Sequence, residues 1–385
     1  MRTVTVVGAS VAGVHAVREL RAQGFDGRVV VVGAESHPPY DRPPLSKGVL
    51  EGTVSEPALR LLDDEELAEL DAQWLLGTAA VSLDAAGRAV VLADGRVVHG
   101  DGVVVATGAA ARTLPGRRPA GVHTLRTLDD ARALRAELAG PPRRVVVVGG
   151  GFVGAETASA CARLGHGVTV VEAAPLPLLP QLGPEAAAAC ARLHARGGVE
   201  LVTGAQVAQV RGASRVTGVA LADGRLLPAD VVVVGVGAAP VTDWLHGSGV
   251  AVRDGVVCDA GCVTALPQVV AVGDVARVDG VRTEHWTAAT RQPAVAVRNL
   301  LAGHTAEVLR EVPYFWSDSY GSRLQFAGER GPGDRFRLVE GSLEEGGFLA
   351  TWERDGAPCA VLALDRPRPF QRLRRALPRV PAKVG

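Results

Sequence analysis

Cysteine is scarce in this 385-residue chain, as are aromatic residues and methionine. The five cysteines are odd in number and irregularly spaced, which argues against a disulfide framework and for a reducing compartment. No Cys-x-x-Cys occurs, so the sequence offers no redox dithiol of that type. The nine histidines are scattered and lack the spacing of metal ligands, so we expect no metal site.

Net charge is also missing, because 41 basic residues balance 41 acidic ones. A neutral chain has no overall field that attracts nucleic acid or a membrane surface. No apolar run reaches the length of a membrane span, and the first residues enter a predicted strand, which leaves no room for a signal peptide. We therefore expect a cytoplasmic protein that binds neither nucleic acid nor membrane. The composition, 47% hydrophobic, is that of a globular protein of two or three domains.

The first 35 residues have the pattern of a dinucleotide-binding unit. Residues 3–7 predict a buried parallel strand, a glycine turn follows, and residues 14–22 predict an amphipathic helix whose first N–H groups can bind a pyrophosphate. A second strand, residues 29–32, leads to Glu35, whose carboxylate can bind the ribose of an ADP group. The turn residues assigned to this site are Gly8, Ser10, Ala12 and Gly13, with Ser10 at the usual middle glycine.

The pattern repeats after residue 144, and here the glycine fingerprint is complete. A strand at 145–148 leads into the turn, a helix runs to Leu164, and a strand at 168–171 ends at Glu172. The Glu172 carboxylate would accept the ribose hydroxyls of NADH and repel the 2′-phosphate of NADPH, so we expect NADH. The predicted nucleotide site comprises Gly149, Gly151, Phe152, Val153, Gly154, Glu156 and Glu172, with Gly235 and Gly237 after a return strand at 231–234.

A proline-rich loop, residues 38–47, lies between these two units in sequence. Proline fixes φ, so the loop is stiff and can hold the Lys47 ammonium group at a fixed point. Together with the two glycine turns, this loop resembles the flavin-dependent ferredoxin reductases, the family of putidaredoxin and rubredoxin reductases. The resemblance extends to the Ala-Thr-Gly run ending at Gly108, the strand ending in Gly273-Asp274 and the Tyr-Phe-Trp-Ser-Asp run at 314–318. It covers nearly the whole chain, least of all residues 366–385.

The resemblance implies an α/β fold with two Rossmann-like dinucleotide-binding domains, of the glutathione-reductase type, and a small α/β C-terminal domain. The second dinucleotide fold looks inserted into the first. The expected boundaries are 1–110 with 239–311 for a discontinuous FAD-binding domain, 111–238 for an NAD-binding domain and 312–385 for a C-terminal interface domain.

The activity implied by the resemblance is hydride transfer from NADH to flavin N5, then release of single electrons to a small [2Fe-2S] ferredoxin. That ferredoxin would feed a cytochrome P450 or an aromatic-ring dioxygenase. Lys47 would stand beside the reactive flavin edge and favour the anionic reduced form, and Glu156 would pair with it and face the nicotinamide. The residues expected at FAD are Gly8, Ser10, Ala12, Gly13, Glu35, Arg42, Lys47, Ala80, Thr107, Gly108, Arg126, Gly273, Asp274, Trp286 and Trp316.

Several alternatives remain open on the sequence alone. Trp286 is equally typical of a core aromatic residue, and Arg126 of a solvated arginine before a helix. The same motifs suit a rubredoxin reductase, an NADH-binding redox sensor of the apoptosis-inducing-factor type or an NADH oxidase that makes peroxide. The basic tail could steer an acidic iron–sulfur carrier or simply be a solvated, partly disordered terminus. Its basic residues are Arg366, Arg368, Arg372, Arg374, Arg375, Arg379 and Lys383.

Overall fold

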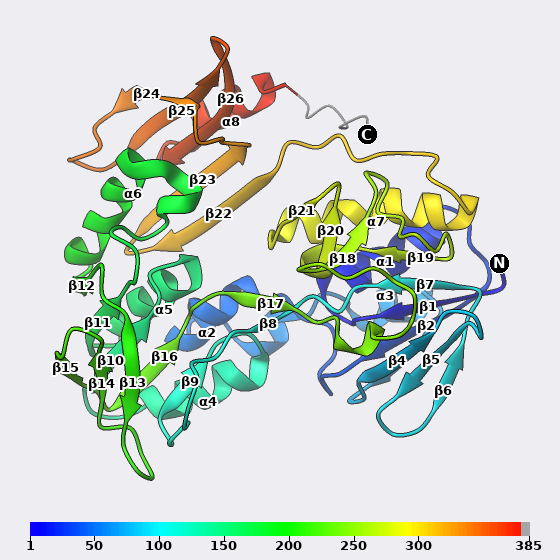
Figure 1. Ribbon diagram of the computed structural model, residues 1–385, viewed down its shortest axis with the longest axis horizontal. Coiled ribbons are helices and arrows are strands. Elements are labelled where there is room, and N and C mark those ends of the chain that lie inside the picture. Colours follow the sequence, from blue (N-terminus) through cyan, green and yellow to red (C-terminus); the bar gives the residue numbers. More distant parts are fainter. Residues whose placement is uncertain (379–385) are drawn as a thin grey trace.

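The computed structural model describes residues 1–378, which form three units (Figure 1). The N-terminal unit lies on the right of Figure 1, the second unit on the left, and the C-terminal unit above the second. Across residues 1–378, no helix is both long enough and apolar enough to cross a membrane. Arg379 and Lys383 of the basic tail lie outside the described residues.

The N-terminal unit is built on a five-stranded parallel sheet. Its strands, in spatial order, are β19 (Val269–Ala271), β7 (Gly102–Val105), β1 (Thr3–Val7), β2 (Arg28–Gly33) and β3 (Ala72–Leu76). Side chains alternate between the faces, so Val4 and Val6 pack with α1 (Val11–Ala22) and α7 (Trp286–Ala302), whereas Val7 faces a small antiparallel sheet. That small sheet is β4 (Ala80–Asp84), β5 (Ala89–Leu92) and β6 (Val97–His99). The remaining elements are α3 (Asp64–Glu69), η3 (Asp243–Leu245), η4 (Gly273–Val275) and the sheet β18 (Val256–Cys258), β20 (Ala276–Val278) and β21 (Val281–Arg282).

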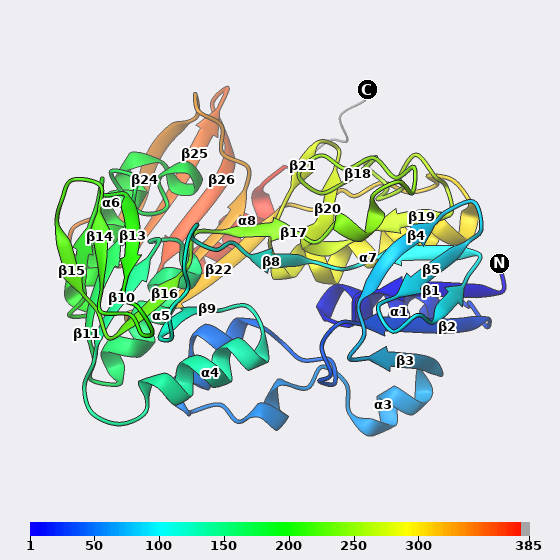
Figure 2. The same ribbon diagram turned by 60° about the horizontal axis from the view of Figure 1, so that its bottom comes forward.

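The second unit repeats this plan. Its parallel strands, in spatial order, are β12 (Glu200–Val202), β11 (Gly167–Val171), β10 (Arg144–Val148), β16 (Val231–Val234) and β9 (Val122–Thr124). One face is covered by α4 (Leu128–Leu138) and α5 (Phe152–Arg163). The other face packs on β13 (Val207–Arg211), β14 (Gly218–Leu221) and β15 (Leu226–Pro228). The connection to the N-terminal unit is the antiparallel pair β8 (Ala109–Ala111) and β17 (Ala238–Pro240), which run side by side in Figures 1 and 2.

The segment that carries Lys47 belongs to the first unit in sequence but packs on the second. It contains η1 (Pro43–Ser46), α2 (Gly48–Glu51) and η2 (Glu56–Leu59). The side chains of Leu45, Val49 and Leu59 are buried in the core of α4 and α5, and α2 lies beside these helices in Figure 1. The proline-rich loop is therefore a bridge that fixes Lys47 against the second unit.

The C-terminal unit is an antiparallel sheet covered on both faces. The strands, in spatial order, are β22 (Tyr314–Ser319), β23 (Ser322–Gly328), β26 (Ala357–Leu364), β25 (Phe348–Arg354) and β24 (Arg335–Gly341). Helix α6 (Leu179–Arg196) of the second unit covers one face, and α8 (Pro367–Ala376) covers the other. Phe370 of α8 is fully buried, so this part of the basic tail is a packed helix, and the interpretation of it as a partly disordered terminus is wrong.

The predicted fold class is confirmed, with two parallel dinucleotide-type sheets and a small third unit. Helix α4 is capped by Thr127, whose side chain accepts from the Asp130 backbone N–H while the Asp130 carboxylate accepts from the Thr127 backbone N–H. The predicted domain boundaries remain a prediction, to which the structure adds the packing of residues 43–59 on the second unit.

Candidate functional site

A cavity of about 710 Å³ lies where the carboxyl ends of the two parallel sheets face each other. Ser10 of the first glycine turn and Gly151 of the second both line it. Lys47 reaches it from the proline-rich loop, and Trp316 reaches it from the C-terminal unit. All three units therefore contribute to one site, at the end of parallel sheets where α/β proteins bind ligands.

The glycines of both turns allow each helix to start directly against a strand end. A Cβ on Gly8 would lie 2.0 Å from the Ala106 carbonyl oxygen, and a Cβ on Gly149 would lie 2.3 Å from the Gly235 carbonyl oxygen. Both glycines have left-handed φ values, +122° and +103°. Around Gly151, by contrast, a Cβ would meet nothing within 4 Å, so the second turn is open toward the cavity.

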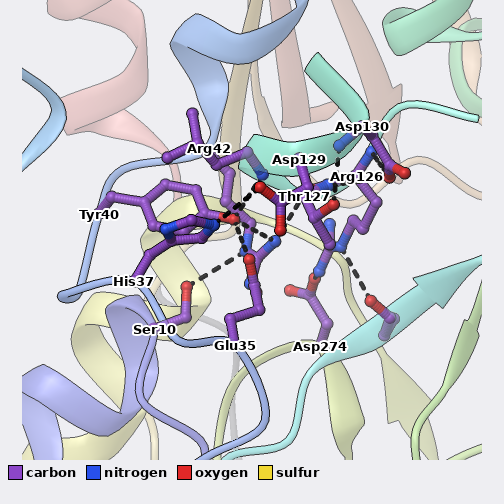
Figure 3. Close-up of polar contacts among 12 residues, drawn as sticks. Ser10, Glu35, His37, Tyr40, Arg42, Arg126, Thr127, Asp129, Asp130 and Asp274 are labelled. Atoms are coloured by element: carbon purple, nitrogen blue, oxygen red, sulfur yellow. Dashed lines mark hydrogen bonds and ion pairs between the residues drawn. The ribbon is translucent and has the colours of Figure 1, made fainter. Parts of the chain in front are cut away.

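Glu35, at the end of β2, anchors a polar network beside the first turn (Figure 3). Its carboxylate accepts from Arg42 Nη2 at 2.6 Å and from the Tyr40 hydroxyl at 2.5 Å. Arg42 Nε also donates to Ser10 Oγ at 3.2 Å. Ser10, which stands where the glycine fingerprint usually has its middle glycine, therefore has a hydrogen-bond partner. Burial raises the pKa of Tyr40, so its hydroxyl stays protonated while it donates to Glu35 and accepts from the Leu128 backbone N–H.

Arg126 spans the floor of the cavity and is not a solvated arginine. Its Nη2 lies 2.6 Å from Asp274 Oδ2, and its Nε donates to the Ala109 carbonyl at 2.8 Å. Figure 3 shows Arg126 and Asp274 facing each other, although 148 positions separate them in sequence. The glycine before the aspartate is also required, because a Cβ on Gly273 would lie 2.9 Å from the Ala12 Cβ.

Lys47 and Glu156 form an ion pair at the inner wall of the cavity. Lys47 Nζ lies 2.7 Å from Glu156 Oε2 and also donates to the Pro43 carbonyl at 3.0 Å. The Glu156 side chain is only 7% exposed and that of Lys47 is 20% exposed. The same carboxylate accepts from the hydroxyls of Ser46 and Ser317, each at 2.6 Å. The buried carboxylate of Glu156 is thus surrounded by hydrogen-bond donors from three different side chains.

Two tryptophans form the wall nearest the C-terminal unit. The rings of Trp286 and Trp316 meet edge to face with centroids 5.8 Å apart. Trp286 is 38% exposed and donates from Nε1 to Asp41 at 2.8 Å, so it is a cavity residue and not a core aromatic. Burial raises the pKa of Asp41 and lowers the pKa of His285, which also lines the cavity and packs on Phe315.

Most of the residues predicted for the site line this cavity. Glu172 lies at the end of the second unit's strand β11, where its carboxylate accepts from the backbone N–H groups of Gly150 and Ala174, each at 2.8 Å. Ala80 does not join the cavity, because it begins β4 and packs against the small antiparallel sheet. The predicted residues that line the cavity are Ser10, Ala12, Arg42, Lys47, Thr107, Gly108, Arg126, Gly151, Phe152, Val153, Glu156, Gly235, Gly237, Asp274, Trp286 and Trp316.

Sequence reasoning missed several polar residues of the site. Ser46 and Ser317 were overlooked although both stand inside motifs that the sequence singled out, beside Lys47 and Trp316. Tyr40 likewise lies inside the proline-rich loop. Gln292 of α7 accepts from the Gly273 backbone N–H at 2.7 Å and has no pattern in the sequence that would have identified it.

Comparison with known proteins agrees with this geometry. A family model described as pyridine nucleotide-disulphide oxidoreductase matches residues 2–293. The chain belongs to this family. A second model, described as reductase C-terminal, matches residues 314–381, which include the antiparallel unit. This member of the family is therefore an oxidoreductase with a reductase-type C-terminal domain.

Its relatives resemble it over almost their whole length. The chain is 37% identical over 375 residues to the ferredoxin reductase component of chlorobenzene dioxygenase from Cupriavidus sp. (strain PS12), covering 95% of this chain and 90% of the relative. It is 32% identical over 386 residues to putidaredoxin reductase of Pseudomonas putida, covering 97% and 91%. The crystal structure of a covalent putidaredoxin reductase–putidaredoxin complex matches with a TM-score of 0.91 at 32% identity, covering 97% of this chain and 92% of that one.

Family membership implies FAD, and the residues around the cavity fit such a group. Arg42 and Arg126 line the cavity near the N-terminus of α1 and would supply guanidinium groups for a pyrophosphate. Asp274 also lines it and would supply a carboxylate for the hydroxyl groups of a ribitol chain. Among residues 1–378 no group of three or more histidine, cysteine or acidic residues could hold a metal ion, and all five cysteines are free thiols.

Proposed function

We propose that this protein is an FAD-dependent NADH:ferredoxin oxidoreductase. It takes electrons from NADH and passes them to a small [2Fe-2S] ferredoxin that serves a cytochrome P450 or an aromatic-ring dioxygenase. The observation that carries the proposal is the Lys47–Glu156 ion pair, which stands in a cavity shared by two glycine-turn units. The names of the relatives, ferredoxin reductases of dioxygenase systems and a putidaredoxin reductase, support ferredoxin as the acceptor.

Bound FAD would supply the hydride acceptance and the one-by-one release of electrons. The protein residues bind, orient and exclude water. Arg42 and Arg126 would neutralise the pyrophosphate, and Asp274 would hold the ribitol hydroxyls. Two N–H groups of the Lys47 ammonium are used by Glu156 and Pro43, so the third is available to the cavity.

Glu172 would select the nucleotide. Its carboxylate lies at the second glycine turn, where the adenosine ribose of a dinucleotide binds in this type of fold. A 2′-phosphate there would meet a negative charge, and residues 173–176 contain no arginine to neutralise it. We therefore propose NADH as the donor in preference to NADPH.

The exit of electrons is proposed at the face formed by the C-terminal unit. Trp316 stacks on Tyr314, and the Arg374 guanidinium of α8 lies 3.9 Å from the centre of the Tyr314 ring. No Cys-x-x-Cys is present, and among the described residues no cysteine is paired, so a dithiol relay has no support. We propose single-electron transfer to a separate carrier as the route.

The basic face of α8 suits an acidic carrier. Arg368, Arg372 and Arg375 are exposed on this helix, whereas Phe370 anchors its other side in the core. The test variant replaces the three arginines by glutamine. This change removes the charges but keeps the helix, whereas deletion of residues 371–385 would remove part of the helix as well. We expect a higher KM for ferredoxin and a weaker salt dependence, because steering between exposed charges is screened by salt. An unchanged salt dependence would remove this part of the proposal.

The test of the proposed function is NADH-driven cytochrome c reduction by the purified protein, with and without an added [2Fe-2S] ferredoxin. Strong stimulation by the ferredoxin is the expected result. Stimulation by a rubredoxin alone would favour the rubredoxin reductase. Rapid oxygen consumption with no carrier would favour the oxidase, and slow turnover with a long-lived NADH complex would favour the redox sensor. A protein that binds no flavin on reconstitution would contradict the proposal entirely.

A further inference from the structure

All three units of the protein meet at the carboxylate of Glu156. Helix α5 of the second unit carries it. The loop of the N-terminal unit supplies Ser46 and Lys47, and strand β22 of the C-terminal unit supplies Ser317. Glu156, Ser46 and Ser317 are 6%, 5% and 4% exposed, so water contributes little to this arrangement.

The donors divide between the two carboxylate oxygens according to the unit they come from. Oε2 accepts from Lys47 Nζ at 2.7 Å and from Ser46 Oγ at 2.6 Å. Oε1 accepts from Ser317 Oγ at 2.6 Å and from the Asp318 backbone N–H at 3.4 Å. Ser317 is thus the short-range partner of the oxygen that faces away from the lysine.

We propose that Ser317 is a positioning residue for the Lys47–Glu156 pair, a role that rests on the proposed function. Its hydroxyl holds Oε1, so the carboxylate presents only Oε2 to the ammonium group. Lys47 then keeps one N–H directed away from Glu156 and available to the cavity. Through this hydroxyl the C-terminal unit would orient the ion pair, in addition to lining the cavity with Trp316.

Without the hydroxyl, Oε1 would be a buried charged atom with one long hydrogen bond. Burial of a charged acceptor without a partner costs free energy, so the carboxylate would rotate and offer both oxygens to Lys47. The ammonium group would then move toward Glu156 and away from the cavity. We therefore expect slower flavin reduction with unchanged NADH binding, because the nucleotide binds at the second glycine turn.

Two substitutions separate the hydroxyl from the packing. Ser317→Thr and Ser317→Val add nearly the same volume to a buried position, but only threonine keeps the hydroxyl. A comparison of these two variants cancels the steric change. The same two substitutions at Ser319, the last residue of β22, serve as the control, because among the described residues the Ser319 side chain forms no hydrogen bond with Glu156.

The experiment is anaerobic stopped-flow reduction of the FAD-loaded protein by NADH alone, at several NADH concentrations. It yields the limiting reduction rate and the dissociation constant of NADH separately. We expect Ser317→Thr to stay near the wild-type rate, and Ser317→Val to fall at least about tenfold below Ser317→Thr with an unchanged dissociation constant. A second readout needs no turnover: urea unfolding of the flavin-free proteins should show Ser317→Val less stable than Ser317→Thr, with no such gap at Ser319.

If NADH reduces the wild-type flavin but the two Ser317 variants are reduced at equal rates, this inference is overturned and the proposed function still stands. A change confined to the NADH dissociation constant would also overturn it. If the wild-type flavin is not reduced by NADH, the proposed function fails, and the role of Ser317 fails with it.

Discussion

The Lys47–Glu156 pair makes a quantitative prediction about coupling. At the 2.7 Å separation of Nζ and Oε2, two unit charges attract by about 6 kcal/mol at an effective dielectric of 20. Removal of both charges from water offsets several kcal/mol of this attraction for each ion. The pair as a whole therefore contributes little net stability, whereas the loss of one partner leaves an uncompensated buried charge that costs about 3 kcal/mol or more.

The perturbation is a double-mutant cycle with Lys47→Met, Glu156→Gln and both together. We expect each single variant to lose about 3 kcal/mol of the free energy of unfolding, and the double variant to lose less than either single variant, so that the coupling is about 3 kcal/mol or more. Urea unfolding of the flavin-free protein, followed by circular dichroism, measures these differences without a contribution from cofactor affinity.

The matched control is the pair Arg60–Asp64, whose charged atoms also lie 2.7 Å apart but whose Asp64 side chain is 87% exposed. Its coupling should stay below about 0.5 kcal/mol, because solvent screens the pair. Additive single variants at Lys47 and Glu156, within about 0.5 kcal/mol, would refute the argument that this pair is a coupled buried unit.

Three further predictions follow from other parts of the molecule. Glu172→Ala should reduce the preference for NADH over NADPH by about tenfold in kcat/KM, because the repelling carboxylate is gone; an unchanged ratio would count against the assignment. Burial raises the pKa of the Cys161, Cys190 and Cys258 thiols to about 12, so a thiol reagent at pH 8 should label these three only after unfolding, as counted by mass spectrometry. Burial raises the pKa of Asp41 above its usual 3.8, so the folded state binds that proton more tightly and the carboxyl stabilises less as pH rises through the raised pKa. Asp41→Asn should therefore be more stable than wild type at pH 7, with a gap that closes toward pH 3.8; a constant gap would contradict this sign.

The candidate site shows where the sequence alone was sufficient. The two glycine turns could be predicted because the requirement is local: Gly8 and Gly149 each need a left-handed φ and the absence of a Cβ beside a strand end. Lys47 was predicted for a similar reason, since the prolines that stiffen its loop are neighbours in sequence. The parallel strands followed from runs of valine that are buried on both faces.

Only the tertiary structure decided how these parts meet. The packing of residues 43–59 on α4 and α5, the pairing of Arg126 with Asp274 and the contact of Ser317 with Glu156 join segments far apart in the chain. Sequence periodicity shows which face of an element is apolar but not which distant element covers it. For the same reason the sequence left open whether the basic tail packs on the protein, and the structure shows that α8 covers one face of the C-terminal sheet. The sequence by itself thus determined the two nucleotide turns and the lysine loop, whereas side-chain packing between distant segments decided which hydroxyl and which guanidinium complete the site.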